Sequence, residues 1–250
     1  MITCTEAIPY QAERKIEIMI SYHSFFVELL VLQCLALASA SLGYNFHYFV
    51  QQWPGSHPCV TRKSCYPTTG KPATNFSITG FRPYYKDGSS ETFCNVSNNP
   101  FDLSKISDLT SKMQANWPSL ACPCSDSTTG LWSREWDKYG TCSESRYLPG
   151  EHAYFKAALD LKDRVNILQI LEKSGIQPNG GFYNLSSIHS AIHKAIGYDP
   201  WIKCNTDASG NGQLYQIYLC VGRYELTFTE CPVLPKTTED CASAIKFPAF

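Results

Sequence analysis

The sequence predicts an α+β fold: one domain in which strands and helices share a core and disulfides tie them together. Strand-like alternation and helix-like spacing occupy separate segments of the 250 residues. The chain is 44% hydrophobic and contains 5 Trp, 15 Tyr and 13 Phe, which is enough for one sizeable core. Its 12 cysteines are too many for an ordinary cytosolic protein and indicate an oxidising compartment.

Three stretches have the pattern of strands. Residues 44–53 are rich in aromatics and end at a Pro-Gly pair, and alternation places His47 on the face opposite Gln52. After a loop at residues 54–74, residues 75–79 read as a second strand that carries Thr79 at its end. Residues 213–221 and 225–230 alternate well enough to form a hairpin.

Three stretches have helical spacing. Residues 102–116 begin with Asp102 as a plausible N-cap, and Trp117-Pro118 follows them. Residues 150–175 form the longest helical segment, with Gly175 as its stop. In residues 186–196, His189 and His193 have the i,i+4 spacing of metal ligands, but a third ligand is missing. We therefore expect no metal and no other cofactor.

The N-terminus has the pattern of a secretory signal. An apolar run at residues 25–38 precedes a small-x-small cleavage site that ends at Ala40. Glu28 and Gln33 interrupt the run, which is too short for a membrane span. We expect residues 1–40 to be removed, with Met19 as an alternative start, leaving a domain at 41–250. The protein would enter the secretory pathway for the cell exterior, cell wall or vacuole, with no membrane attachment after signal removal.

Residues 131–142, LWSREWDKYGTC, contain the densest group of charged and aromatic side chains. At 100° per residue, one helical face holds Arg134, Glu135, Lys138 and Tyr139, and Trp136 points the other way toward a core. The Gly and Cys that follow are expected to end the helix and tie it down. Two cations, a carboxylate and a phenol suit a phosphate, although a solvated charged face fits these residues as well.

This stretch resembles HEWxKHGTC, the second signature of the ribonuclease T2 family of secreted acid endoribonucleases. The first signature of that family, FxIHGLWP, resembles FSITGFRP at residues 76–83. Further similarity to plant S-like ribonucleases lies at residues 49–56, 65–72, 195–205 and 213–221. The resemblance implies a central antiparallel sheet with several packed helices.

The chain departs from this family where protons are transferred. In the family, the general acid and the general base are histidines at the positions of Thr79 and Tyr139, and a phosphate-binding histidine stands at the position of Arg134. Of the five principal site residues, only Glu135 and Lys138 remain. The side chain of Thr79 has no group that takes up or releases a proton near neutral pH. A tyrosine phenol, with an ordinary pKa near 10, stays protonated in acid. The sequence therefore predicts a site that keeps anion-binding groups and lacks proton-transfer groups.

Four further residues bear on this site. By resemblance Gln52 belongs to a base-binding pocket, although a strand-end glutamine in a turn is the alternative. Leu131 replaces a phenylalanine that stacks on a base, so base recognition should be weaker. Arg82 replaces a tryptophan and either adds a third cation near the phosphate or points into solvent. We interpret His47 as a packed strand histidine rather than a replacement catalyst.

The resemblance also implies a set of disulfides, and the sequence contains N-glycosylation sequons. Family-type pairs carry over to Cys65–Cys122, Cys94–Cys142, Cys204–Cys241 and Cys220–Cys231. Cys59 and Cys124 would then lie near one another, and we hypothesise that they pair. The sequons begin at Asn75, Asn95 and Asn184.

The net charge of −1 lacks the strongly basic footprint of a dedicated nucleic-acid binder, so any RNA contact must be local. We expect a monomer that binds single-stranded RNA, nucleotides or phosphate weakly, has no DNA specificity, and is catalytically inactive or severely impaired. Its role would be storage or defence. The alternatives are an active endoribonuclease that forms a 2′,3′-cyclic phosphate and a storage protein with no ligand.

Overall fold

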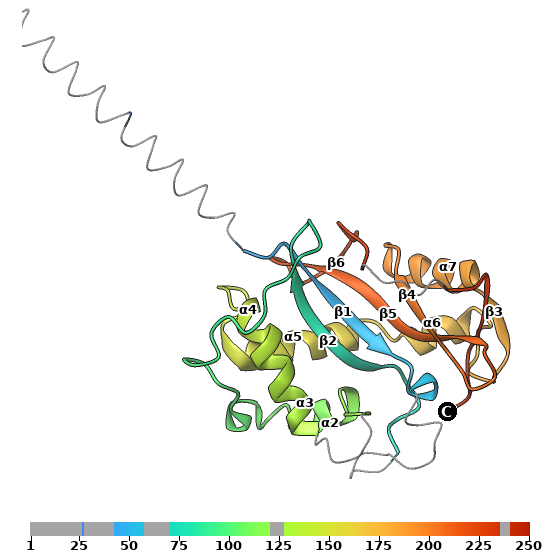
Figure 1. Ribbon diagram of the computed structural model, residues 1–250, viewed down its shortest axis with the longest axis horizontal. Coiled ribbons are helices and arrows are strands. Elements are labelled where there is room, and N and C mark those ends of the chain that lie inside the picture. Colours follow the sequence, from blue (N-terminus) through green and yellow to red (C-terminus); the bar gives the residue numbers. More distant parts are fainter. Residues whose placement is uncertain (1–26, 28–42, 58–70, 121–127, 236–240) are drawn as a thin grey trace, which may run out of the picture. The chain divides into compact units, whose positions relative to one another are not determined.

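The computed structural model describes residues 27, 43–57, 71–120, 128–235 and 241–250. The chain divides into two compact units, Met1–Gly43 and Tyr44–Phe250. Apart from Val27, the expected signal at residues 1–40 lies outside the described residues. Strands and helices of the second unit appear in Figure 1.

One mixed sheet organises the second unit. Its strands pair in the order β2-β1-β5-β7-β3, and β4 and β6 also pair with β5. The β5–β7 pair is parallel and the other pairs are antiparallel, so the α+β fold with a central antiparallel sheet is confirmed. The first strand and the hairpin are also where the sequence predicted them. The strands are β1 (Phe46–Gln52), β2 (Ser77–Tyr84), β3 (Phe182–Asn184), β4 (Trp201–Thr206), β5 (Gly212–Gly222), β6 (Phe228–Thr229) and β7 (Ala244–Lys246).

Two of the three predicted helical segments are broken into shorter elements, whereas the helix predicted at residues 186–196 is present as α7. Residues 102–116 form two elements, although Asp102 caps the first one as expected by accepting from the Ser104 amide at 3.0 Å. Residues 150–175 break at Val165, and Asn166 caps a new helix by accepting from the Gln169 amide. No helix in the described ranges is long and apolar enough to cross a membrane. The helical elements are η1 (Pro54–Ser56), η3 (Leu103–Ile106), α2 (Thr110–Asn116), α3 (Thr128–Glu135), η4 (Trp136–Gly140), α4 (Thr141–Ser143), α5 (Gly150–Arg164), α6 (Ile167–Lys173) and α7 (Leu185–Ile196).

The second strand differs from the prediction. β2 does not end at Thr79 but continues to Tyr84, because β1 is long enough to pair with all of it. Val50 pairs with Gly80 and Gln51 pairs with Ile78, so Thr79 is an extra residue in a β-bulge. Bulges re-aim a side chain and occur often beside active sites.

The two faces of β1 have different surroundings, as its alternation predicted. Phe49 lies in the main core with the helices, and Gln51 accepts from the Lys162 ammonium of α5 at 2.7 Å. Tyr48 and Val50 belong to a second, smaller cluster on the opposite face. The main core holds the four largest fully buried side chains, Trp53, Trp117, Trp132 and Trp136.

Three of the expected disulfides are present: Cys94–Cys142, Cys204–Cys241 and Cys220–Cys231. The first ties the segment after β2 to α4. The cysteines of the expected Cys65–Cys122 and Cys59–Cys124 pairs lie outside the described residues.

Gly140 lies against the ring of Trp136, where a Cβ atom would approach Cε3 to 2.2 Å. We predict that Gly140→Ala lowers the free energy of unfolding by about 1–3 kcal/mol, because Trp136 is fully buried and must move. Urea unfolding followed by tryptophan fluorescence measures the change. Gly212→Ala is the matched control, since no atom lies within 4 Å of its Cβ position. Equal stabilities for the two variants would contradict the prediction.

Candidate active site

The helix that carries the second signature contains a π-helical turn. The amide of Thr141 bonds the carbonyl of Trp136, five residues earlier, so α3 continues through η4 into α4. The expected helix end at Gly140 is therefore wrong, because Gly140 adopts a helical conformation and its missing side chain makes room for Trp136. Single π turns within helices are frequent at functional sites. This one presents Lys138 and Tyr139.

Glu135 binds the exposed edge of the sheet. Its Oε1 accepts from the amide of Phe81 at 3.3 Å and from Nε of Arg82 at 3.1 Å, and only 5% of the residue is exposed. The hydroxyl of Tyr154 donates to the carbonyl of Phe81 at 2.5 Å. Both polar backbone groups of Phe81 are thus satisfied although β2 is an edge strand.

Arg82 does not point into solvent. Its Nη2 donates to the carbonyl of Thr79 at 3.1 Å, and its Cζ lies 4.8 Å from the ring centre of Tyr139. Burial opposes the charged form, but the carboxylate of Glu135 outweighs it and raises the pKa of Arg82 above its ordinary value. A Cβ at Gly80 would lie 2.6 Å from Nε of Arg82, so glycine leaves the space that the guanidinium needs. The solvent-pointing alternative for Arg82 is therefore wrong, and its role as a third cation near a phosphate stays a prediction.

The structure brings most of the expected site residues together. Thr79 and Arg82 come from β2, Glu135 ends α3, and Lys138 and Tyr139 lie on η4. The ammonium of Lys138 lies 5.1 Å from the ring centre of Tyr139. We call these five residues the cleft cluster. It combines two cations and one buried carboxylate around a phenol and a threonine, a set that attracts an anion.

Three expected site residues are not part of the cleft cluster. Arg134 is exposed on the last turn of α3. Gln52 is buried at the end of β1, between Ser77 and Gln216 of the neighbouring strands. Leu131 is half-buried and packs against the main core, which leaves part of its side chain accessible.

His47 has a structural position. It is fully buried, stacks on Phe81 with 4.1 Å between ring centres, and its Nε2 lies 3.3 Å from Oγ of Ser143. Burial, aided by the charge of Arg223, lowers the pKa of His47 to about 3. The interpretation of His47 as a packed strand histidine is confirmed.

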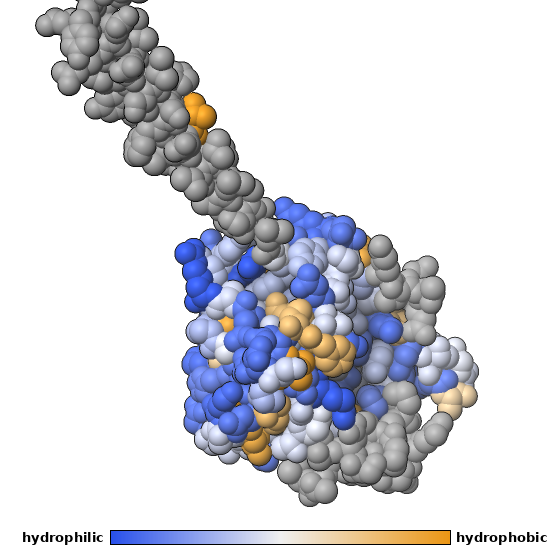
Figure 2. Space-filling model, turned by 60° about the vertical axis from the view of Figure 1, so that its left-hand side comes forward, coloured by the Kyte–Doolittle hydropathy of each residue, from blue (hydrophilic) through white to orange (hydrophobic). Residues whose placement is uncertain are grey.

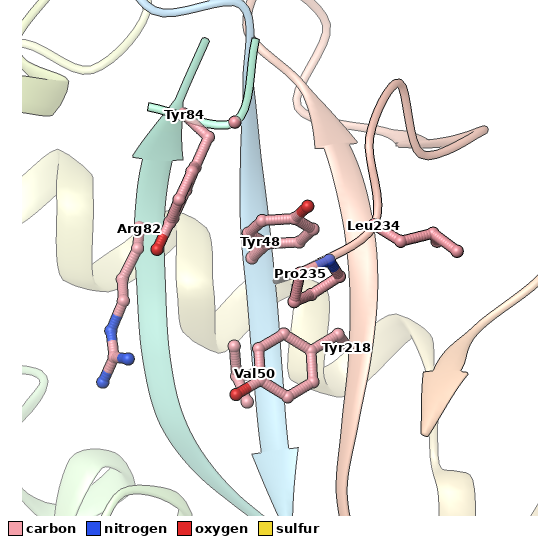
Figure 3. A pocket seen from close by; sticks show the side chains of 8 residues that line it. Tyr48, Val50, Arg82, Tyr84, Tyr218, Leu234 and Pro235 are labelled. Carbon is pink, nitrogen blue, oxygen red and sulfur yellow. The ribbon is translucent and has the colours of Figure 1, made fainter. Parts of the chain in front are cut away.

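The sequence did not predict a pocket that has Arg82 in its wall (Figure 3). It has a volume of about 250 Å³, and tyrosine rings from three strands form much of its wall. Burial raises the pKa of Tyr218 to about 12, so this phenol stays neutral. Alternation in β1 could have identified Tyr48, but Tyr218 joins it only through strand pairing. The lining residues are Tyr48, Val50, Arg82, Tyr84, Gly88, Tyr218, Leu234 and Pro235.

Comparisons with known proteins agree with this architecture. The profile of the Ribonuclease T2 family matches residues 44–231. Extracellular ribonuclease LE of Solanum lycopersicum is 50% identical over 231 residues, covering 92% of this chain and 98% of that protein. Intracellular ribonuclease LX of the same species is 48% identical over 235 residues, covering 93% and 96%. The crystal structure of RNase NT in complex with 5′-AMP superposes with a TM-score of 0.76 at 48% identity, covering 83% of this chain and 99% of that one.

The burial of His47 predicts a specific acid sensitivity. Its folded-state pKa of about 3 is below the ordinary 6.5, so between these values the unfolded chain binds a proton that the folded chain excludes. The contribution of His47 to the free energy of unfolding is therefore fully present above pH 6.5 and is lost as the pH falls toward 3. We predict that His47→Phe reduces the loss of unfolding free energy between pH 6.5 and 4.5 by about 2 kcal/mol.

Chemical unfolding at a series of pH values measures this effect. His152→Phe is the matched control, because its imidazole is exposed and contacts Asp108 on the surface. Parallel pH profiles for wild type and His47→Phe would show that His47 does not carry the acid sensitivity.

Proposed function

Since this chain belongs to the ribonuclease T2 family, we propose that it is a secreted member that binds single-stranded RNA, nucleotides or phosphate but cleaves RNA poorly or not at all. The observation that carries the proposal is the composition of the cleft cluster. Thr79 and Tyr139 stand at the positions of the family's proton-transfer histidines, and the guanidinium of Arg82 lies between them, bound to the Thr79 carbonyl and over the Tyr139 ring.

The loss of proton transfer is chemically severe. In active relatives a base takes the proton from the ribose 2′-hydroxyl and an acid protonates the leaving 5′-oxygen. Each positioned acid or base contributes about 10²–10⁴ in rate, so losing both costs on the order of 10⁴–10⁸ if the contributions multiply. Neither a threonine hydroxyl nor an ordinary phenol accepts a proton in the acidic range.

Glu135 is a poor substitute for the missing base. Its carboxylate already accepts from the Phe81 amide and from Arg82, contacts that hold it against the sheet edge. Glu135 also forms an ion pair with Arg82 at 3.1 Å in a nearly buried position, so its oxygens face the sheet edge and the guanidinium. Glu135 therefore anchors Arg82.

Anion binding, in contrast, has support from the cluster. Lys138 and Arg82 are cations beside the same phenol ring, and arginine forms strong hydrogen bonds to phosphate. The pocket that has Arg82 in its wall offers tyrosine rings to the nucleoside part of a ligand. RNase NT, a structural neighbour, is known in complex with 5′-AMP. Gln52 and Leu131 are proposed as weaker contributors to base binding.

We further propose a monomeric protein of the secretory route, at the cell exterior or in the vacuole, with a storage or defence role. Relatives with extracellular and intracellular names occur at similar identity, which supports the route but not one destination. Asn95 and Asn184 are exposed and accessible for glycosylation. Asn75 is half-buried and precedes β2, and its side-chain oxygen accepts from the Phe76 amide.

Restoring the histidines tests the catalytic proposal. We predict that the wild-type mature protein is at least about 100-fold slower on single-stranded RNA at pH 5 than a Thr79→His/Arg134→His/Tyr139→His/Arg82→Trp variant, because one acid and one base are regained. The triple variant that keeps Arg82 should gain less, since the guanidinium remains paired to Glu135 and bound to the backbone carbonyl at position 79. If the wild-type protein turns over RNA as fast as the variant with all four substitutions, the protein is better described as an active endoribonuclease.

Phosphate linkage tests the binding proposal. At ten times its Kd, inorganic phosphate should add about 1.4 kcal/mol to the free energy of unfolding. Lys138→Gln should weaken this stabilisation, whereas Lys156→Gln, at an exposed lysine of α5 that pairs with Asp160, should not. Differential scanning calorimetry across a phosphate series gives the measurement. A protein that phosphate does not stabilise would be better described as a storage protein with no ligand.

A further inference from the structure

A second surface of the protein presents arginine beside tyrosine at the tips of two turns. The first turn spans residues 145–148, where Ser145 and Leu148 exchange backbone hydrogen bonds. The hydroxyl of Ser145 also accepts from the amides of Tyr147 and Leu148. This tight closure places Arg146 and Tyr147 at the tip.

The second turn follows β5. The amide of Gly222 bonds the carbonyl of Thr227 at 2.9 Å, and the amide of Leu226 bonds the carbonyl of Gly222 at 3.2 Å. Leu226 has a φ of 50°, a conformation that is strained for a residue with a side chain. Arg223 and Tyr224 lie at the tip of this closed turn.

The two tips meet through their aromatic rings. The ring centres of Tyr147 and Tyr224 are 5.4 Å apart at 73°. Arg146 lies over the Tyr147 ring at 4.6 Å, and Arg223 lies over both the Tyr224 ring at 5.6 Å and the Tyr44 ring at 4.7 Å. We call these five residues the Arg–Tyr ladder. Arg146 is exposed, and Tyr224 is 54% exposed, so the ladder has free aromatic and cationic surface.

The ladder lies outside the cleft but on elements that lead to it. Its first turn follows α4, which continues directly from η4 with Lys138 and Tyr139, and the Tyr44 hydroxyl bonds the carbonyl of Ser143 at 3.1 Å. Along the first strand, Tyr44 is six residues from Val50, which pairs at the bulge, a distance of about 20 Å. An extended polymer could reach both surfaces.

The chemistry of the ladder points to one class of partner. Single-stranded nucleic acids bind where aromatic rings accept bases and nearby cations neutralise phosphates, without a requirement for sequence. Figure 2 shows the face that comes forward from the left of Figure 1 as mostly hydrophilic around a smaller hydrophobic group. Arg164, which donates to the Leu226 carbonyl, adds a third cation, while exposed Glu144 and Glu225 flank the two tips.

We propose that the Arg–Tyr ladder is an additional binding site for single-stranded RNA, which holds a segment of the chain outside the cleft. This inference rests on the proposed RNA-binding function and adds a surface to it. It implies that affinity depends on RNA length, since a short ligand reaches only the cleft.

Fluorescence anisotropy with an uncleavable 2′-O-methyl oligouridylate of 12 nucleotides tests this site in the full mature protein. We expect Tyr224→Ala to weaken binding by about 5- to 150-fold, because base–aromatic stacking is lost, and Tyr224→Phe to retain it. Arg146→Gln should reduce the slope of log K against log salt concentration by about 0.7, the value for one phosphate contact on a single strand. Tyr224→Ala and Arg146→Gln should both bind 5′-AMP with the affinity of wild type. Tyr198→Ala, at a tyrosine with 36% exposure elsewhere on the surface, is the matched control.

Three results would overturn the inference. If Tyr224→Ala and Arg146→Gln both bind the 12-mer as tightly as wild type, the ladder does not bind RNA. If Lys138→Gln weakens binding in the same experiment, the proposed binding role of the cleft cluster still holds. Equal weakening by Tyr198→Ala would make the effect non-specific. Competition by polygalacturonate that depends on Tyr224 as strongly as RNA binding does would assign the ladder to acidic polysaccharide. If 12-mer, 5′-AMP and phosphate all fail to bind wild type, the proposed function fails with it.

Discussion

The contact between Glu135 and the edge of β2 determines how the cleft cluster is arranged. A nearly buried carboxylate needs partners, and here it has the Phe81 amide on one side and the Arg82 guanidinium on the other. These contacts join α3 to the side of β2 that faces away from β1, where no further strand pairs among the described residues. They also fix Arg82 over Tyr139 and against the Thr79 carbonyl. The arrangement and the charge of the cleft cluster therefore depend on the ion pair between Glu135 and Arg82.

In the proposed function, this ion pair is what would separate anion binding from proton transfer. Arg82 forms an ion pair with Glu135, the signature carboxylate that this chain shares with the family. Arg82 also adds positive charge near Lys138. The groups that face the cleft from β2 and η4 are a bulged threonine and a phenol. His47, although close in sequence to Gln52, faces the helices and is sealed under Phe81. A ligand would meet charge and aromatic surface without an exchangeable imidazole from β1.

Sequence patterns predicted the elements whose surroundings are uniform along their length. Alternation placed Tyr48 and His47 on opposite faces of β1, because one face packs on helices throughout. Sequence patterns did not predict features that are determined by tertiary contacts. The end of β2 depends on the length of β1, and the π turn depends on the packing of Gly140 against Trp136.

The candidate site shows the same limit. Resemblance identified Thr79, Glu135, Lys138 and Tyr139, and the structure brings them together. The position of Arg82 could not be decided from sequence, because it requires both the space at Gly80 and a carboxylate 53 residues away. The Tyr147–Tyr224 contact joins turns that are distant in sequence, so neither turn alone predicts it.

A crystal structure with a bound uncleavable dinucleotide at pH 5 would show whether the site lacks proton-transfer groups. We expect a phosphate within hydrogen-bonding distance of Lys138 and Arg82, Glu135 still bound to the Phe81 amide, and only Thr79 and Tyr139 beside the scissile atoms. An imidazole, from His47 or His152, hydrogen-bonded to the ribose 2′ position or to the leaving 5′-oxygen would contradict this expectation.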